Sequence, residues 1–417
     1  MNNIKYLIIG AGVTGLAFAN YIKSNNYLIL EKENKPGGYC KTIYKDGYIW
    51  DYSGHFYHFN NEILRQEFLN NLGYENIIIK DKNTKIFYNK LLIDYPFQSN
   101  IHQLSKDEFI ECLYDIFHST PKRYYKSFED MLYSKYGKSI TEKFLKPYNE
   151  KLYACSLKEL DKNAMGRFFP NTNIVDIIEN MKSKHDNSYN KEFYYPKLGS
   201  IMFINYLLEK LHDDKILYNN KVIKIDIDNK IAYTSDSAIK YEVLINTSPL
   251  NYFINMVYRK KSDILKYNKV IVYNLGFDKK SKYTNLHWLY VPSANFIFYR
   301  VGFYDNILNA DKLSLYVEVS LKPEEAIDAE SKIPQIINEL KEMEIIEDHK
   351  LISYSIIEMD PAYVHVSNES GYFVNKIKNQ LRKNDIYTIG RYGGWRYCSI
   401  EDCIIEAKNL ASELLTI

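Results

Sequence analysis

Hydrophobic residues at the start of the chain form two short continuous runs, separated by a glycine-rich turn and a helical pattern. Residues 5–9 read Lys-Tyr-Leu-Ile-Ile and lead directly into a Gly-x-Gly-x-x-Gly turn over residues 10–15. Apolar side chains then follow at helical spacing over residues 16–22, and residues 27–30 form the second run. Short apolar runs bounded by turn residues indicate strands buried on both faces, as in a parallel sheet with crossover helices. The pattern therefore predicts a strand–turn–helix–strand unit.

The periodicity of apolar residues changes twice along the rest of the chain. From residue 61 to about residue 186 apolar side chains recur at intervals of three and four, which predicts a largely helical lobe. From about residue 268 to residue 375 β-like runs dominate, which predicts a lobe built on an antiparallel sheet. The expected helices cover residues 107–117, 125–145, 200–211 and 401–415, and the expected strands cover residues 216–227, 242–246, 269–273, 294–300, 312–319 and 386–390.

These changes predict an α/β fold with three parts. Residues 1–60, 190–265 and 380–417 are expected to form the nucleotide-binding domain. Residues 61–189 are expected to be an inserted, largely helical lobe, and residues 266–379 a β-sheet lobe that binds the substrate.

The glycine turn carries the first indication of chemistry. A Gly-x-Gly-x-x-Gly motif between a strand and a helix brings backbone N–H groups and the helix N-terminus close to a pyrophosphate. An acidic residue about 20 positions later, here Glu31, accepts hydrogen bonds from ribose hydroxyls and favours NAD or FAD over NADP. The predicted cofactor contacts in this segment are Gly10, Gly12, Val13, Thr14, Gly15, Glu31 and Lys32.

A second glycine turn follows soon after the ribose-binding acid. Residues 36–42 read Pro-Gly-Gly-Tyr-Cys-Lys-Thr, and Gly54 and His55 follow an Asp-Tyr-Ser segment. The first of these resembles the Glu…Gly-Gly segment of flavoproteins of the glutathione reductase, amine oxidase and mutase superfamily, in which extended FAD lies along the domain. The resemblance implies FAD as the cofactor in a Rossmann-like domain of that type, with contacts from Gly38, Tyr39, Cys40, Gly54 and His55.

Composition narrows the classes of function. With 54 basic and 52 acidic residues the net charge is +2, which gives no electrostatic case for nucleic acid. No apolar run approaches the ~20 residues that span a bilayer, so membrane insertion is not expected. The chain enters a strand at once, which leaves no room for a signal peptide. Its five cysteines are odd in number and lack metal-ligand spacing, which predicts reduced thiols in a cytoplasmic protein and no metal.

Four further segments, in order along the chain, resemble one family. They are Gly-His-Phe-Tyr-His at residues 54–58, Tyr-Pro-Phe-Gln at residues 95–98, Lys-Pro-Tyr-Asn-Glu-Lys-Leu-Tyr at residues 146–153, and Gly-Arg-Tyr-Gly-Gly-Trp-Arg-Tyr at residues 390–397. Together with the glycine turn they make the chain similar to the UDP-galactopyranose mutase family, or to the related protoporphyrinogen-oxidase-like group.

The resemblance implies a specific reaction. In the mutases the N5 atom of reduced FAD attacks the anomeric carbon of a nucleotide sugar, and the resulting adduct opens and recloses in the other ring size. It implies a UDP-linked sugar as the favoured substrate, a place in cell-surface polysaccharide synthesis, and NAD(P)H as a candidate external reductant. The helical lobe is a candidate surface for a homodimer.

The family motifs also imply roles for individual residues. Arg300 and Arg167 are expected to bind the substrate diphosphate, since a guanidinium fork suits phosphoryl oxygens. His55 and His58 are expected near the flavin N5–O4 edge. The other expected substrate contacts are Tyr148, Tyr153, Tyr363 and Tyr397, and the other expected flavin contacts are Val222, Gly390, Arg391, Arg396, Tyr397, Ser399 and Ile400.

Some positions depart from the mutase pattern and keep alternatives open. Tyr153 replaces a tryptophan, Ser399-Ile400 replaces Asp-Met, and the run at residues 287–292 is closer to the protoporphyrinogen-oxidase-like group. The alternative activity is an FAD-dependent oxidoreductase of the amine-oxidase or protoporphyrinogen-oxidase type, and a third is a non-catalytic flavin-binding protein. With 40 tyrosines in the chain, core packing is an alternative role for each tyrosine, and a surface salt bridge is an alternative role for Arg300.

Overall fold

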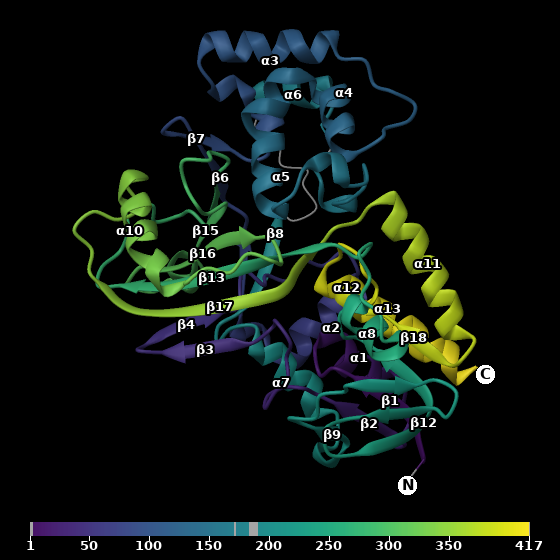
Figure 1. Cartoon of the computed structure of the whole chain (residues 1–417). Helices are drawn as coiled ribbons and strands as arrows, with labels where there is room; N and C mark the ends of the chain where they lie inside the picture. The colour runs from purple at the N-terminus through teal and green to yellow at the C-terminus, as the bar shows by residue number, and fades with distance from the viewer. Residues whose placement is uncertain (1–2, 171, 183–190, 417) are drawn as a thin grey trace.

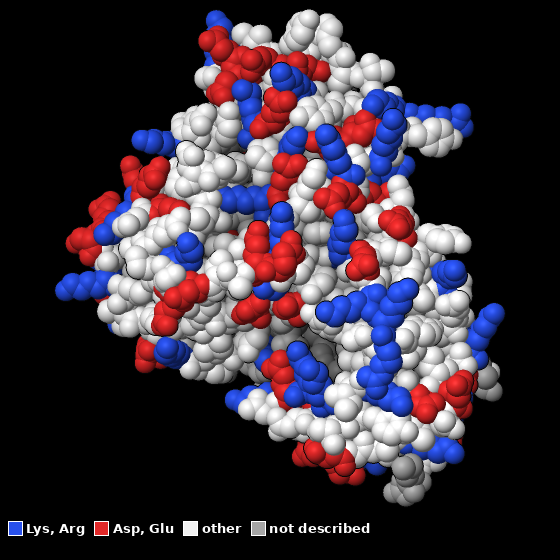
Figure 2. Space-filling view, viewed as in Figure 1, with Lys and Arg blue, Asp and Glu red and all other residues white. Residues whose placement is uncertain are grey.

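The computed structural model describes residues 3–170, 172–182 and 191–416. In this part of the chain two seven-stranded sheets form the framework, and a group of helices stands at one end (Figure 1). Basic and acidic side chains are interspersed over the face seen in Figure 2, in keeping with the small net charge. None of the described helices is both long and apolar enough to cross a membrane.

The first sheet is the predicted nucleotide-binding sheet. Its order is β10-β11-β12-β1-β2-β9, with β18 paired to β12, and its central pairs are parallel. The Rossmann-like α/β fold class predicted from the apolar runs is confirmed. The strands are β1 (Asn3–Ile9), β2 (Tyr27–Leu30), β9 (Ile216–Leu217), β10 (Lys224–Asp226), β11 (Ile231–Tyr233), β12 (Ala238–Asn246) and β18 (Ile386–Thr388).

Helices cover both faces of this sheet. The first of them, α1, is buried almost all round, because α13 and α7 pack against it on the side away from the strands. A capping box formed by Ser399 and Asp402 begins α13. The helices are α1 (Val13–Tyr21), α2 (Glu62–Leu72), α7 (Ile201–Glu209), α8 (Leu250–Tyr258), α11 (Asn368–Arg382), α12 (Gly390–Gly393) and α13 (Ile400–Leu415).

The second sheet has the order β17-β13-β16-β15-β14-β6-β7. All of its pairs are antiparallel except β14 with β6, so the expectation of a purely antiparallel sheet needs this correction. Its strands and the helices beside it are β6 (Thr84–Tyr88), β7 (Leu91–Asp94), β13 (Tyr267–Phe277), β14 (Trp288–Tyr290), β15 (Arg300–Phe303), β16 (Ser314–Leu321), β17 (Leu351–Val364), α9 (Tyr304–Leu308) and α10 (Ile333–Glu342).

Two expected strands differ from the structure. Residues 294–300 were expected to be extended, but they form a turn and β15 begins only at Arg300. Residues 216–227 divide into β9 and β10 with a loop between them, which carries Val222. In the first case the buried residues Phe296, Phe298 and Tyr299 imitated a strand pattern, whereas in the second only Val222 of the loop is buried.

The helical group contains α3 (Lys106–His118), α4 (Phe128–Ile140), α5 (Lys146–Tyr153) and α6 (Ile174–Lys182), which lie together at the top of Figure 1. The continuous helix expected over residues 125–145 is interrupted. Gly137 has φ +70°, and a side chain there would lie 2.8 Å from the backbone oxygen of Asp115 on α3. A π-helical turn over Thr141–Leu145 then leads into α5. Two small sheets complete the fold: β3 (Thr42–Lys45) with β4 (Tyr48–Asp51), and β5 (Ile77–Asp81) with β8 (Glu192–Pro196).

Candidate functional site

The glycine turn after β1 leaves the N-terminus of α1 open to a cavity. Gly10 has φ +100°, which an L side chain rarely adopts, and Gly12 is the N-cap of α1 without any side-chain cap. A side chain at Gly12 would meet Gly38 of the second glycine turn at 3.9 Å. The two turns therefore face each other with only backbone between them, and the first N–H groups of α1 are available to an anion.

Glu31 fixes this arrangement. One carboxylate oxygen accepts the N–H of Ala11 at 2.8 Å, and the other accepts the N–H of Glu33 at 3.0 Å. Gly37 in turn donates its N–H to the oxygen of Ala11 at 2.8 Å. Each oxygen of a carboxylate has a second lone pair, so Glu31 can hold the turns and still accept from a ribose hydroxyl.

A cavity of about 1280 Å³ runs along these turns, and we call it the larger cavity. Most of the residues expected to contact the cofactor line it: Gly10, Gly12, Val13, Thr14, Glu31, Lys32, Gly38, Tyr39, Cys40, Gly54, His55, Val222, Arg391, Tyr397, Ser399 and Ile400. The sequence motifs therefore converge on one continuous wall in the fold.

Three other expected cofactor contacts stand behind that wall. A side chain at Gly15 would lie 2.1 Å from the oxygen of Gly10, and one at Gly390 would lie 2.4 Å from Oγ1 of Thr14. The Nη2 atom of Arg396 contacts Oε2 of Glu406 at 2.8 Å, which also accepts the N–H of Gly390 at 2.7 Å. These residues are not among those that line the cavity, and their contacts support its wall.

Both candidate histidines are held neutral by their surroundings. Burial lowers the pKa of the His55 imidazole to about 4, and the positive charge of Arg391 acts in the same direction. Its buried Nδ1 atom has no hydrogen-bond partner among the described residues. Burial also lowers the pKa of His58 to about 4, and its Nδ1 lies 2.9 Å from the backbone oxygen of Glu192. Neither ring carries charge at neutral pH.

A second cavity of about 670 Å³, the smaller cavity, lies against the larger one. Aromatic side chains make up much of its wall, among them Tyr95, Tyr148, Trp288 and Tyr290. Seven residues line both cavities: Gly54, Phe56, His58, Phe168, Arg300, Tyr363 and Tyr397. The two cavities therefore meet at a shared wall that contains several of the predicted catalytic residues.

Arg300 lies in that shared wall, but it is already paired. Its Nε and Nη2 atoms contact the two carboxylate oxygens of Glu318 at 2.6 and 2.7 Å. The two residues lie directly opposite each other on β15 and β16. Although burial alone would raise the pKa of the Glu318 carboxyl, the Arg300 guanidinium lowers it below its usual range. Sequence reasoning missed Glu318, whose only signal is a charged residue within the apolar run of residues 312–319.

The predicted tyrosines divide into two groups. Tyr363 and Tyr397 stack with ring centroids 6.0 Å apart, and the Arg391 guanidinium lies 4.7 Å from the Tyr397 ring. Tyr148 also lines the smaller cavity. Tyr153, by contrast, is fully buried behind Tyr363 and lines neither cavity, which argues against the direct substrate contact expected of it.

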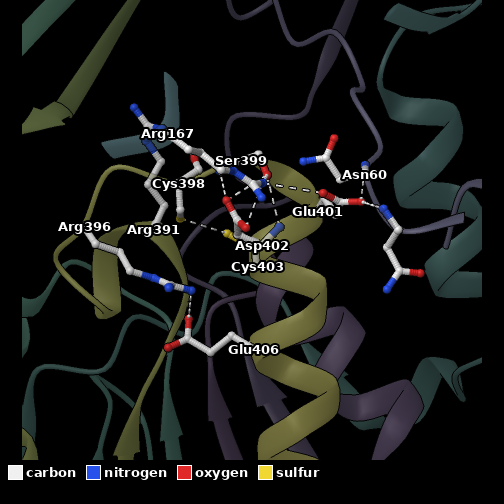
Figure 3. Close-up of polar contacts among 11 residues, drawn as sticks. Asn60, Arg167, Arg391, Arg396, Cys398, Ser399, Glu401, Asp402, Cys403 and Glu406 are labelled. Atoms are coloured by element: carbon white, nitrogen blue, oxygen red, sulfur yellow. Dashed lines mark hydrogen bonds and ion pairs between the residues drawn. The ribbon is translucent and has the colours of Figure 1, made fainter. Parts of the chain in front are cut away.

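Arg167 approaches the same region from a short 3₁₀ turn, Gly166–Phe168. Its Nη2 atom lies 2.9 Å from Oδ1 of Asp402 and 3.5 Å from Oε2 of Glu401 at the start of α13 (Figure 3). The side chain is 40% exposed and lines the smaller cavity. Like Arg300, it already contacts carboxylates.

Several known proteins are similar to this chain. Residues 8–72 match the model of the NAD(P)-binding Rossmann-like domain family. The UDP-galactopyranose mutase of Mycoplasma genitalium is 24% identical over 249 residues, which span 54% of this chain and 60% of that protein. The match with this curated relative therefore covers less than two thirds of its length.

Solved structures extend the similarity to the whole fold. A reduced UDP-galactopyranose mutase aligns with a TM-score of 0.91 at 22% identity, covering 100% of this chain and 94% of that one. A protoporphyrinogen-oxidase-like protein from Exiguobacterium sp. 255-15 aligns with a TM-score of 0.77 at 17% identity, covering 99% of each chain. A putrescine oxidase bound to putrescine aligns with a TM-score of 0.67 at 11% identity, covering 100% of each chain. The resemblance to the mutase and protoporphyrinogen-oxidase-like proteins is confirmed, and at these identities it shows the fold.

Proposed function

We propose that this chain is an FAD-dependent mutase that interconverts the pyranose and furanose forms of a nucleotide-activated sugar, with a UDP-linked sugar favoured. The observation that carries the proposal is the shared wall. A cavity lined by the dinucleotide fingerprint meets an aromatic cavity at Arg300, Tyr363 and Tyr397. A reaction between a bound cofactor and a sugar needs this adjacency, because the two must meet with water excluded.

The residues of the larger cavity fit FAD. The facing turns at Gly12 and Gly38 leave backbone space for a pyrophosphate, and the buried Nδ1 of His55 is an unused polar atom in the wall. FAD, when bound and reduced, supplies the nucleophile for the anomeric carbon of the sugar. We propose that Gly10 to Thr14 hold the phosphates, that Glu31 holds the ribose, and that Arg391 lies on the flavin side.

In the smaller cavity the aromatic side chains would exclude water and stack on the base or the sugar. We propose that the hydroxyls of Tyr363 and Tyr397 donate hydrogen bonds to the phosphates. Burial raises the pKa of Tyr397 to about 12, so its hydroxyl keeps its proton at neutral pH and can donate. The first sheet would thus hold the cofactor, while the second sheet and the helical group hold the substrate.

The diphosphate requires a cation, and here the two arginines differ. Arg300 is buried in its pair with Glu318, so releasing it would leave an uncompensated buried carboxylate. Arg167 is 40% exposed, and its buried partner Glu401 keeps the backbone N–H groups of Asn60 and Asn61, so exchanging Asp402 and Glu401 for a phosphate costs less desolvation. We propose that Arg167 is the main contact for the diphosphate and that Arg300 contributes through Nη1, which forms no hydrogen bond within the described chain.

The alternative is an FAD-dependent oxidoreductase of the amine-oxidase or protoporphyrinogen-oxidase type acting on a small molecule. One observation favours it: the bidentate pair with Glu318 cancels the charge of Arg300 beside the shared wall. A substrate without a diphosphate would fit that wall without any exchange of partners.

The wider setting belongs to the proposal as well. We propose that the enzyme is cytoplasmic, because all five cysteines are free thiols. We also propose NAD(P)H as its external reductant. The product would feed cell-surface polysaccharide synthesis. We propose that two copies of the chain form a homodimer through the helical group.

The deciding experiment uses the purified protein without oxygen. UDP-galactose and UDP are added to the oxidised and the photoreduced protein, while the flavin spectrum is followed and NMR identifies the sugar products. Furanose formation confined to the reduced protein supports the mutase. Bleaching of the oxidised flavin by a small amine or another small-molecule substrate, with no response to UDP compounds, supports the oxidoreductase instead.

A further inference from the structure

Three of the five cysteines line the larger cavity. They are Cys40, which is distant in the sequence, and the neighbouring Cys398 and Cys403. Their spacing matches no metal motif. Nor do the described residues contain a cluster of three or more His, Cys, Asp and Glu that could hold a metal ion. We therefore consider a reaction of these thiols that needs no metal ion.

Two of these thiols are brought together by the start of α13. Ser399 is the N-cap of that helix and Asp402 completes its capping box, so Cys398 stands at N′ and Cys403 at N4. These are the positions whose side chains meet in a hydrophobic staple. The sulfur atoms lie 3.7 Å apart, with the two thiols pointing at each other in Figure 3. A disulfide needs a separation of about 2.05 Å, so the two sulfur atoms are close but not yet at bonding distance.

The surroundings favour reaction at Cys403. The two sulfur atoms share a hydrogen bond, and where Cys398 donates it the pKa of Cys403 is lowered below its usual value despite burial. Two further features favour the thiolate of Cys403. It lies in the first turns of a helix, and Arg391 Nη1 nearby donates a hydrogen bond to the backbone oxygen of Cys398 at 2.8 Å. Burial instead raises the pKa of Cys40 well above its usual value, which keeps that third thiol protonated.

We propose that Cys398 and Cys403 form a peroxide-sensitive dithiol in the wall of the larger cavity. The Cys403 thiolate attacks one oxygen of hydrogen peroxide and becomes a sulfenic acid, while the other oxygen leaves as hydroxide, which is protonated to water. The Cys398 thiol then displaces the hydroxyl of the sulfenic acid, which forms the disulfide and releases a second water. Two thiols lose two electrons and peroxide gains them, so the step balances, and an added dithiol reverses it.

Burial explains why the oxidant should be small. Cys398 is 5% exposed and Cys403 is 7% exposed, so only a small molecule can reach either thiol. Hydrogen peroxide is small and uncharged, so it can reach this wall where a bulky disulfide reagent cannot. Formation of the bond would draw Cys398 toward α13, and with it the neighbouring Tyr397 in the shared wall.

The test maps cysteine oxidation in the purified full-length protein. The protein is treated with increasing hydrogen peroxide, alkylated, digested and measured by mass spectrometry. We expect a Cys398–Cys403 disulfide that disappears on treatment with dithiothreitol, formed about tenfold faster or more than any oxidation of Cys155, since burial raises the pKa of that thiol to about 12. This measurement needs no variant and does not depend on the activity of the enzyme.

Cysteine variants then separate the thiol that reacts with peroxide, Cys403, from the thiol that completes the disulfide, Cys398. In Cys398→Ser the sulfenic acid should persist at Cys403 and react with dimedone, whereas in Cys403→Ser both the disulfide and the dimedone adduct at this site should be lost. Cys112→Ser, on α3 and away from both cavities, is the matched control and should form the disulfide as the unaltered chain does. If peroxide oxidises Cys155 while Cys398 and Cys403 stay reduced, the pair is a staple contact only and the proposal fails.

Discussion

The two cavities that meet at the shared wall are built from different parts of the chain. Backbone bounds the phosphate end of the larger cavity, where Gly12 and Gly38 face each other and Glu31 ties the turns together. Side chains bound the smaller cavity, where rings stack, and the Arg300–Glu318 pair joins two strands at the wall shared with the larger cavity. A backbone site depends on the absence of side chains, while a side-chain site depends on long-range pairing. The following substitutions should therefore damage the two cavities in different ways.

The largest effect is expected from Glu318→Ala, at the ion pair beside the shared wall. Removing one partner of a buried ion pair leaves the Arg300 charge uncompensated, which should lower the free energy of unfolding by about 3–5 kcal/mol. Chemical denaturation at neutral pH measures it. The double variant Arg300→Met, Glu318→Met should recover most of the loss, since an apolar pair of similar volume replaces the ions. A loss below about 1 kcal/mol would instead mean that the pair behaves like an exposed salt bridge.

A smaller loss of stability, together with loss of cofactor, is expected from Gly15→Ala behind the larger cavity. The added carbon would lie 2.1 Å from the oxygen of Gly10, so the backbone of the turn must shift. Overpacking of this kind costs about 1–3 kcal/mol, and the shift should reduce the flavin bound per protein, measured by absorbance after desalting. Gly371→Ala is the matched control, because a side chain on that α11 residue meets nothing within 4 Å. It should gain about 0.5–1 kcal/mol in stability. Equal flavin content in both variants would contradict the assignment.

The same contrast explains what could be predicted from the sequence. The glycine turns and Glu31 were found because they act through local backbone at short spacing. The partner of Arg300 was missed because it depends on the register of β15 against β16, which pairs residues 18 positions apart. The loop at residues 294–299 imitated a strand because its buried apolar residues, not hydrogen bonding, were the visible signal, whereas in the loop at residues 218–223 only Val222 is buried.

Helical geometry alone could have shown that Tyr153 and Tyr148 lie on different sides of their helix. It lies five residues after Tyr148 on α5, and five residues turn a helix by about 140° beyond a full turn. The two rings therefore cannot face the same cavity, and the structure places only Tyr148 in the wall. The family motif aligned both positions without indicating which face each one occupies.

Arg167→Met tests the smaller cavity through the binding of UDP. Its ion pair with Asp402 is partly exposed, so stability should change by only about 0–1 kcal/mol. If it holds the diphosphate, the loss of a charge-assisted hydrogen bond of about 1.5–3 kcal/mol should weaken UDP binding by about tenfold or more. Isothermal titration with UDP measures this. Arg382→Met removes an ion pair with Glu413 away from both cavities and should leave the affinity unchanged. Equal affinities in the two variants would remove Arg167 from the substrate site.

The last effect is expected in the pH dependence of stability, at the wall between the cavities. The pKa of His55 is about 4 in the folded chain, against about 6.5 in the unfolded chain. Between these values the unfolded state binds more protons, so stability falls as pH drops from about 6.5 towards 4. Burial also lowers the pKa values of His58, His287 and His365 to about 4, so His55→Asn should flatten the slope only in part.

Denaturation midpoints measured from pH 7 to pH 4 give this slope. His349→Asn serves as the control, since that histidine lies by Phe277 on the second sheet and lines neither cavity. An unchanged slope in His55→Asn would mean that the His55 ring protonates as freely in the folded chain as in the unfolded one. The wall of the larger cavity at His55 would then be open to water. It would not be the buried polar surface that here distinguishes the larger cavity from the aromatic smaller cavity.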